Sequence, residues 1–341
     1  MSEKKLFVGI DLGTSRSSIS TSEGKHEYVD SFVGWPLDMV ARKVLKREVL
    51  VGEEALNNRG MLDLHRPLER GLLKEGSEKD QQAVRELVAY LMKKSGVTQA
   101  REEGVSVRGV VGVPAEALRI NRKRLKEAMQ GFMDHMIIVS EPFAVAYGME
   151  ALLHALVLDI GAGTADFCLM QGRYPTEEDQ RTLPNAGDWV DEQLIKTLKE
   201  DIPGLAVSIH TIRRWKEKYG FIGKASKPVK LTTPIGGKPT EIDITEALQQ
   251  NCNAILPPLA ETMLDLIATV DPDYQENVRN NVILAGGTGM MKGLGDALEK
   301  ALKPYGGGKV RLAEDTIFQG SRGGLALAMD APSGDWEKLT G

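Results

Sequence analysis

Two distant segments of this chain repeat one pattern, and the repeat constrains the fold more than any other feature of the sequence. In one copy the apolar run Leu6–Ile10 ends in Asp11, and a turn and a second alternating run follow. In the other, Leu156–Ile160 carries Asp159 near its end, and a turn and a second apolar run follow. The turn residues are Gly13, Thr14 and Ser15 in the first copy, and Gly161, Ala162, Gly163 and Thr164, followed by Asp166, in the second. Either copy alone is compatible with an ordinary β-hairpin. The repeat predicts a duplicated domain with a related strand–turn–strand unit in each half.

The glycines in these turns indicate a backbone that binds anions. Glycine lets a ligand approach the main chain closely, and consecutive N–H groups in a turn form an anion-binding concavity. We therefore expect the two hairpins to hold a polyphosphate from both sides. Polyphosphates bind with Mg²⁺, which takes one or two carboxylates and keeps several waters. Asp11 and Asp159 are the candidate carboxylates, although Asp159 is also compatible with a turn residue that bonds its own backbone.

Hydrolysis of a polyphosphate needs a side chain that positions water in line with the terminal phosphate. Glu141 is the candidate, because Ser140-Glu141-Pro142 lies where a predicted strand meets a predicted helix. The alternative interpretation is an acid in the first turn of a helix, favoured by the helix dipole.

Two further segments are candidates for binding a base and a ribose. The backbone of Gly286-Gly287-Thr288 can approach a flat ring. Lys216-Glu217, on a helix predicted over 206–219, offers a carboxylate for ribose hydroxyls. The alternative for this pair is an ordinary charged pair on a helix surface.

The 341-residue length predicts two lobes. Strands alternate with helices in both halves, which predicts an α/β fold with a mixed β-sheet flanked by helices in each lobe. We expect a first lobe core at 1–33, 73–140 and 319–341, with a small insertion at 34–72. We expect a second lobe core at 141–184 and 246–318, with a small insertion at 185–245. An apolar stripe over 245–268, interrupted by Pro257-Pro258, predicts one kinked helix capped by Thr245.

Composition argues against several other classes of protein. The net charge of −5 makes nucleic acid an improbable direct partner. Cys168 and Cys252 show no metal-binding spacing and indicate small core residues. No apolar run approaches the ~20 residues needed to span a bilayer. The charged start, Met1–Lys5, resembles neither a signal peptide nor an amphipathic anchor, so we expect no direct membrane insertion.

Six segments, in family order, resemble five motifs of the ATPase superfamily that contains actins, heat-shock chaperones and sugar kinases. Ile10–Ser15 and Asp159–Asp166 are similar to its two phosphate motifs, and Ile283–Thr288 resembles its adenosine motif. Val110–Pro114 and Ser140–Gly148 resemble the segments around its first connection between the two lobes. Trp215–Tyr219 is similar to the ribose-contacting Lys-Glu helix of actins. The resemblance implies an actin-like ATPase fold. It also implies that Glu141 positions water, that Asp11 and Asp159 act through Mg²⁺ and its waters, and that Met291 belongs to the adenosine loop.

Within the superfamily the chain resembles bacterial actins, most of all the magnetosome-associated actin-like proteins. Further segments that carry this resemblance are Gly172–Pro175, Asp179-Gln180, Asn185–Gly187 and Phe318–Gly324. It implies a protein that binds and hydrolyses ATP with Mg²⁺ and polymerises into cytoplasmic filaments that position magnetosomes in a chain. The implied partners are further copies of itself and magnetosome-associated proteins. The alternatives are a plasmid-segregation or cell-shape filament, a sugar or acetate kinase, for which neither insertion offers a catalytic Asp, and a chaperone ATPase, which is expected to carry a further substrate-binding domain.

Overall fold

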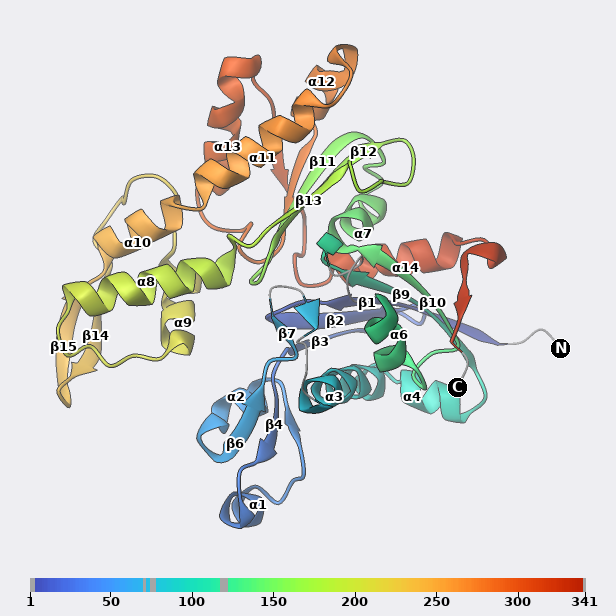
Figure 1. The fold of residues 1–341 in the computed structure, drawn as a ribbon, viewed down its shortest axis with the longest axis horizontal. Coiled ribbons are helices and arrows are strands. Elements are labelled where there is room, and N and C mark those ends of the chain that lie inside the picture. Colours follow the sequence, from blue (N-terminus) through green and yellow to red (C-terminus); the bar gives the residue numbers. More distant parts are fainter. Residues whose placement is uncertain (1–3, 70–71, 74–77, 117–121, 340–341) are drawn as a thin grey trace. The chain divides into compact units, whose positions relative to one another are not determined.

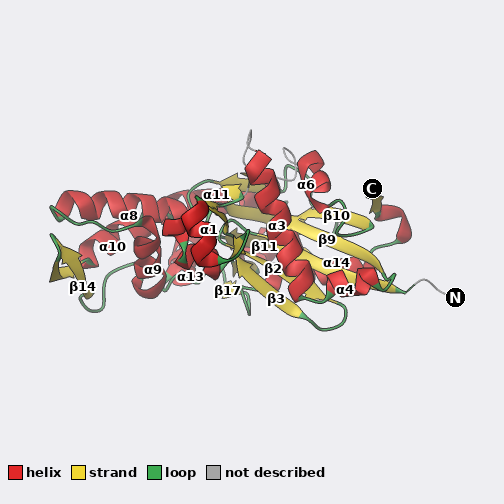
Figure 2. Cartoon of the chain, turned by 90° about the horizontal axis from the view of Figure 1, so that it is seen from below, coloured by secondary structure: helices red, strands yellow, loops and turns green. Residues whose placement is uncertain are grey.

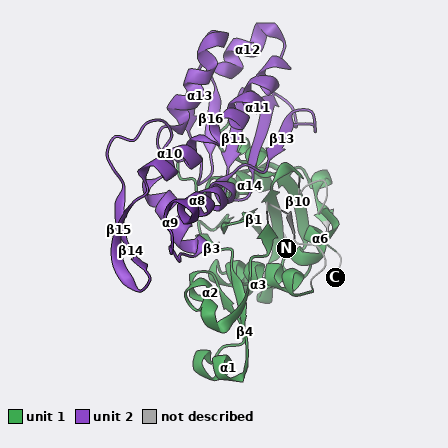
Figure 3. Cartoon of the chain, turned by 60° about the vertical axis from the view of Figure 1, so that its left-hand side comes forward, with its two compact units in different colours: residues 1–152, 314–341 green, residues 153–313 purple. Residues whose placement is uncertain are grey.

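The computed structural model describes residues 4–69, 72–73, 78–116 and 122–339, so Met1–Glu3 of the charged start lie outside the described residues. The chain forms two compact units, residues 1–152 with 314–341 and residues 153–313 (Figure 3). We expected residues 141–152 and 314–318 in the second lobe, and the structure corrects this: both segments belong to unit 1. The division of each unit into a core and an insertion stays a prediction.

Unit 1 is built on a six-stranded sheet in the order β18-β10-β9-β1-β2-β3. Its strands are β1 (Lys5–Leu12), β2 (Arg16–Thr21), β3 (His26–Asp30), β9 (Ser106–Val113), β10 (His135–Ser140) and β18 (Glu337–Lys338). β1 pairs antiparallel with β2 and parallel with β9. The predicted strand–turn–strand unit at Asp11 is therefore confirmed, and Asp11 lies near the carboxyl end of β1.

Helices cover both faces of this sheet. They are α3 (Glu78–Lys94), α4 (Val97–Glu102), α6 (Arg122–Met129), α7 (Glu141–Gly148) and α14 (Gln319–Asp330). Val8 and Ile10 of β1 share a buried cluster with the apolar face of α3, which lies across the sheet in Figure 2. Gly9 points to the other face, because side chains alternate along a strand.

The close packing of α14 explains why residues 141–152 belong to unit 1. A Cβ atom at Gly9 would overlap the backbone of Ser321, and a Cβ at Gly323 would overlap the carbonyl oxygen of Ala144 in α7. Glycines thus let α14 lie backbone to backbone against both β1 and α7. The sequence order, in which α7 directly follows β10, does not reveal this contact.

Most of the segment predicted as the small insertion of unit 1 lies below the six-stranded sheet in Figure 1 and has a small apolar core of its own. Its elements are β4 (Val33–Pro36), α1 (Met39–Leu45), β5 (Leu50–Val51), α2 (Glu53–Asn57), η1 (Arg59–Met61) and β6 (Leu62–His65), with β7 (Leu68–Glu69) and β8 (Leu72–Leu73) following. The buried side chains of Phe32, Leu50, Ala55 and Leu62 form its core. The imidazole of His65 lies 2.7 Å from the carboxylate of Asp80, which connects β6 to α3.

Unit 2 contains a five-stranded sheet in the order β13-β12-β11-β16-β17. Its strands are β11 (Leu153–Ile160), β12 (Ala165–Gln171), β13 (Gln180–Leu183), β16 (Val282–Ala285) and β17 (Val310–Leu312), and β14 (Lys230–Ile235) and β15 (Lys238–Asp243) form a separate ribbon. β11 pairs antiparallel with β12 and parallel with β16. The second predicted strand–turn–strand unit is therefore confirmed as well.

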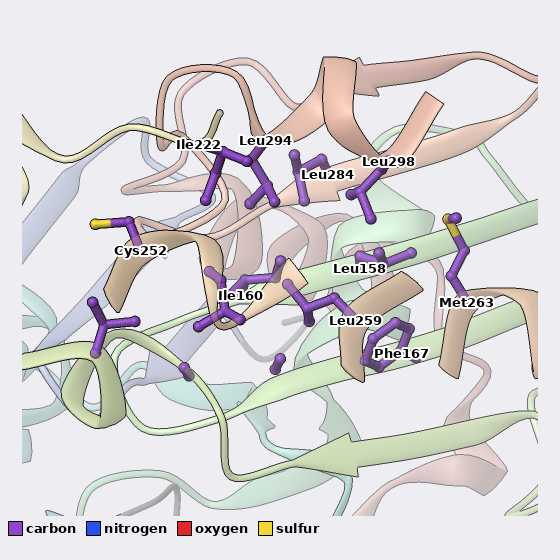
Figure 4. Packing of buried hydrophobic residues seen from close by; sticks show 14 of the residues in the cluster. Leu158, Ile160, Phe167, Ile222, Cys252, Leu259, Met263, Leu284, Leu294 and Leu298 are labelled. Carbon is purple, nitrogen blue, oxygen red and sulfur yellow. The ribbon is translucent and has the colours of Figure 1, made fainter. Parts of the chain in front are cut away.

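The helices of unit 2 bury the apolar face of this sheet. They are α8 (Gly187–Asp201), α9 (Ile209–Tyr219), α10 (Thr245–Asn253), α11 (Leu256–Ala268), α12 (Pro272–Arg279) and α13 (Leu294–Leu302), with η2 (Lys303–Tyr305) after them and η3 (Ser333–Asp335) near the end of unit 1. Figure 4 shows Phe167 of β12 beside Leu259 and Met263 of α11. Cys168 and Cys252 are buried, as predicted.

The single kinked helix predicted over 245–268 is wrong, because the structure has two helices there. α10 ends at Asn253 and α11 begins at Leu256, so Pro257 lies in the first turn of α11, where no intrahelical N–H is needed. Thr245 does not cap α10. Its hydroxyl donates to Asp243 at 2.5 Å and accepts the N–H of Val229 at 2.7 Å. Among the described residues, no helix has both the length and the apolar content needed to cross a bilayer.

Candidate functional site

In unit 1, three consecutive carbonyl groups of the turn between β1 and β2 accept hydrogen bonds from residues that lie later in the chain. Ser31 donates its hydroxyl to the carbonyl oxygen of Gly13 at 2.7 Å and its N–H to that of Ser15 at 2.8 Å. The Nε–H of Arg66 donates to the carbonyl oxygen of Thr14 at 2.8 Å. In a trans peptide the N–H points away from the preceding carbonyl. The N–H groups of Thr14 and Ser15 are therefore turned away from the segments that hold the carbonyls.

Asp11 and Glu141 come together beside this turn. Glu141 is the first residue of α7, and its side chain hydrogen-bonds Asp11. Asp11 is partly buried, and a Cβ at Gly320 would lie 2.6 Å from its Oδ2, so α14 lies close against the carboxylate. Burial raises the pKa of Asp11 to about 7, and the hydrogen bond from Glu141 partly offsets that rise. Near neutral pH a substantial fraction of the Asp11 carboxyl is therefore protonated.

In unit 2, the turn between β11 and β12 is held in the same way. The carbonyl oxygen of Gly161 accepts the N–H of Gly187 at 3.2 Å and the hydroxyl of Thr288 at 2.7 Å. The carbonyl oxygen of Ala162 accepts the N–H of Asp188 at 2.7 Å. The first N–H groups of α8 thus hold the turn from one side, and the N–H groups that follow these two carbonyls point to the other side.

Those N–H groups belong to Ala162 and Gly163. Within the described part of the chain, neither donates to a protein acceptor. The turn itself is closed by the N–H of Gly161, which donates to the carbonyl oxygen of Thr164 at 2.9 Å. Two adjacent amides on the side of the turn opposite α8 are an arrangement that can bind an anion.

The predicted adenosine loop packs directly on this second hairpin. Gly286 has a φ of +78°, and a Cβ there would overlap the Asp159 carboxylate and the carbonyl oxygen of Ile160. The same carbonyl accepts the N–H of Thr288 at 2.9 Å. Gly287 has no atom near the position of a Cβ, and Met291 donates its N–H to the Thr288 carbonyl at 3.0 Å. Unit 2 therefore brings together Asp159, the second hairpin and the predicted adenosine loop.

Lys216 lies beside the same hairpin, but its ammonium is engaged within the protein. Its side chain is only 7% exposed, and its Nζ donates to the carbonyl oxygen of Gly187 at 2.5 Å. It also lies 2.9 Å from Asp191 of α8, whose side chain is fully buried. Arg213 completes this group at 3.4 Å from Asp191 and 2.8 Å from Asp188. Burial raises the pKa of Asp191, and the charges of Lys216 and Arg213 only partly offset the rise.

The remaining predicted residues have different surroundings. Glu217 is exposed on α9, so its carboxylate is accessible to a ligand. Asp166 is buried and accepts the hydroxyl of Thr182 at 2.6 Å, which ties β12 to β13. Asp166 therefore supports the hairpin from within the sheet.

Sequence reasoning did not identify Ser31, Arg66, Asp188 and Asp191, which hold the two hairpins and their surroundings. They act through hydrogen bonds and ion pairs between segments distant in sequence. No local pattern marks them, apart from the acidic type of Asp188, which is favoured in the first turn of a helix.

Comparison with known proteins supports an actin-like identity over almost the whole chain. The MreB/Mbl protein family matches residues 5–328. The "Actin-like protein MamK" of Paramagnetospirillum magneticum is 36% identical over 337 residues, which cover 99% of this chain and 96% of that protein. The protein of the same name from Magnetospirillum gryphiswaldense is also 36% identical, over 99% of this chain and 92% of its own length.

Solved structures agree with this assignment. A MamK double helical filament has a TM-score of 0.91 at 35% identity and covers 96% of this chain and 100% of its own. A non-polymerising MamK mutant bound to AMPPNP has a TM-score of 0.72 at 35% identity, with the same coverage. The predicted actin-like fold is confirmed, and this chain belongs to the MreB/Mbl family of actin-like proteins.

Proposed function

We propose that this chain binds ATP with Mg²⁺, hydrolyses it to ADP and phosphate, and polymerises into cytoplasmic filaments that organise magnetosomes into a chain. One observation carries the nucleotide part of this proposal. In both hairpins, protein donors hold the turn carbonyls from behind, which directs the following N–H groups outward. A related structure, the non-polymerising MamK mutant, was solved with AMPPNP bound.

We assign the phosphates to the backbone of Gly13–Ser15 and of Gly161–Thr164, and the base to Gly286–Thr288 with Met291 beside it. Glu217 is exposed and able to accept hydrogen bonds from the ribose hydroxyls. Lys216 precedes Glu217 on α9, and we assign it to the ribose side of the site as a neighbour of the ligand. Its ammonium already bonds Gly187 and Asp191, so we assign it no direct contact with the ribose.

The acidic residues fit a magnesium ion bound through water. The described residues contain no group of three or more His, Cys, Asp or Glu side chains able to hold a metal ion. Mg²⁺ bound to a nucleotide does not need such a group, because phosphates and waters supply most of its ligands. Asp11 and Asp159 would each hold waters of such an ion, which would neutralise charge on the phosphates.

Glu141 is suited to position and activate the attacking water. It begins α7 at the carboxyl edge of the first sheet, and it already exchanges a hydrogen bond with Asp11. As a carboxylate it would orient a water and accept its proton. The Glu141→Ala variant is expected to retain nucleotide binding and to release phosphate at least ~10²-fold more slowly. An unchanged rate of phosphate release would exclude this role.

The polymerisation part of the proposal is supported by the relatives and by one exposed surface. Two related structures are MamK filaments. In the unit 1 insertion, four apolar side chains at and before α1 are 59–83% exposed: Leu37, Met39, Val40 and Val44. A cluster of this kind on a monomer marks a contact surface. We assign it to contact with the next copy of this chain in a filament.

Electron microscopy and pelleting with and without ATP and Mg²⁺ test the filament. We expect filaments in ATP, and a protein that stays monomeric at tens of micromolar would contradict the proposal. A Met39→Lys, Val44→Lys double variant should raise the concentration needed for assembly. Lys43→Gln, on the same helix, is the matched control, since Lys43 is exposed and polar.

The magnetosome role rests on the identity with MamK proteins. Its partners would be proteins on the magnetosome surface, and co-sedimentation of preassembled filaments with isolated magnetosomes tests this. Filaments that form normally but do not sediment with magnetosomes would favour a plasmid-segregation or cell-shape filament instead.

A further inference from the structure

Arg66 connects the small insertion of unit 1 to the first phosphate hairpin. It directly follows β6, a strand of the three-stranded sheet β5-β4-β6 in the insertion. Its Nε–H donates to the carbonyl oxygen of Thr14 at 2.8 Å, and its guanidinium carbon lies 5.9 Å from the centre of the Phe32 ring. Ser31, just before β4 on the entering side, holds the carbonyls of Gly13 and Ser15. The residues that flank β4 and β6 in sequence, Ser31 and Arg66, therefore both donate hydrogen bonds to this one turn.

The contact from Arg66 has two physical effects on the turn. The planar guanidinium fixes the direction of its Nε–H, so the bond sets the orientation of the peptide between Thr14 and Ser15. The cation also lies behind that peptide, on its carbonyl side, and polarises it. Hydrogen bonds in series strengthen one another, so the N–H of Ser15 becomes a better donor to an anion.

The position of Glu141 indicates which phosphate this turn receives. Glu141 contacts Asp11, two residues before Gly13. A residue that positions the attacking water must lie near the terminal phosphate. If Glu141 has that role, the first hairpin lies at the terminal phosphate, which ATP has and ADP lacks.

We propose that Arg66 is a positioning residue that makes the first hairpin bind ATP more tightly than ADP. This inference rests on the proposed nucleotide function and on the role of Glu141. Arg66 does not touch the nucleotide. It acts through the Thr14 carbonyl and through its positive charge.

The test compares the affinities of AMPPNP and ADP, each with Mg²⁺, by isothermal titration calorimetry below the assembly concentration. Arg66→Gln removes the charge and the Nε–H. It should weaken AMPPNP about tenfold or more, as expected for one charge-assisted hydrogen bond. Binding of ADP should change less than about threefold. Arg59→Gln is the matched control, because Arg59 is exposed in the same insertion and donates to the nearby Leu56 carbonyl at 3.1 Å.

A purely structural role for Arg66 would lower the affinity for both nucleotides equally, or change only the melting temperature, and either result would overturn the proposal. If the Gln variant does not fold, Arg66→Lys serves instead. It keeps the charge but not the planar donor, and it should still lower the AMPPNP-to-ADP affinity ratio. An unchanged ratio in the Lys variant would overturn the proposal as well. If the unmodified protein binds neither nucleotide, the proposed function fails before the role of Arg66 is reached.

Discussion

The buried ion pair between Lys216 and Asp191 offers a sharp test of how unit 2 supports its hairpin. Lys216→Met keeps the length and apolar stem of the side chain but leaves Asp191, which is fully buried, with Arg213 alone at 3.4 Å. Removing one partner of a buried pair costs about 3–5 kcal/mol. Because Arg213 remains, we expect the lower end, about 3 kcal/mol.

A loss of about 3 kcal/mol corresponds to a drop of about 6–12 °C in the melting temperature of a domain of this size. Calorimetry of the nucleotide-free protein measures it, and the two units make separate transitions possible. Because burial raises the pKa of Asp191 above its unfolded value, the buried carboxyl is easily protonated at low pH. The loss in the variant should therefore be smallest at acidic pH and grow as the pH rises.

The Asp191→Asn background provides the decisive comparison. In that background the buried carboxylate is absent, so Lys216→Met should lower the free energy of unfolding by at least ~1.5 kcal/mol less than it does in the unmodified protein. The reason is that two charges in contact are strongly coupled. Lys218→Met is the surface control on the same helix, where Lys218 lies 5.1 Å from the ring of Tyr219. An equal loss in both backgrounds would refute the ion-pair reasoning. A variant of normal stability that binds ATP poorly would indicate a direct ribose contact instead.

The remaining predictions concern the two carboxylates and the adenosine loop. The pKa of Asp11 is raised to about 7, so Asp11 contributes to the stability of the folded state most fully below pH about 4. This stabilisation is lost as the pH rises through about 7. The free energy of unfolding of the nucleotide-free protein should fall by at most ~4 kcal/mol over that window. The measured fall in the free energy of unfolding will be smaller than this limit, because Asp11 is partly exposed. Urea titrations at several pH values should show that the fall is absent in the Asp11→Asn variant. Asp159→Ala should weaken the Mg²⁺ dependence of turnover, measured as phosphate release against Mg²⁺ concentration, and unchanged dependence would contradict our assignment of that acid. Gly286→Ala should destabilise unit 2 by at least ~1 kcal/mol, because the left-handed φ and the overlap with Asp159 oppose any Cβ. Thermal melting measures this, and an unchanged transition would contradict the overlap.

Much of the fold could be predicted from local pattern. The runs that carry Asp11 and Asp159 form the strands β1 and β11, and each is followed by a tight turn and an antiparallel partner. These predictions are confirmed because alternating apolar residues and turn glycines act over a few neighbouring positions. The site residues themselves stay predictions, although each unit gathers its own candidates.

The sequence was less informative about where one helix ends and the next begins, and about which helices pack on one another. A continuous apolar stripe did not reveal that α10 and α11 are separate helices, and chain order did not reveal that α7 packs on α14. The first outcome follows from Pro257, which is favoured in the first turn of a helix and here begins a new one. The second follows from Gly323, which lets α14 approach α7 closely, and this contact joins segments far apart in the sequence.

By itself, the sequence determined that two glycine turns follow acidic strand ends, since those turns need only their own residues to form. Tertiary structure decided which way the turns face. Arg66 and Ser31 hold the carbonyls of the first turn, and Gly187 with Thr288 holds the Gly161 carbonyl in the second. A peptide group has two opposite polar ends, so holding the carbonyl from one side directs the N–H to the other. The donors that do this come from distant parts of the chain, and only folding brings them to the turns.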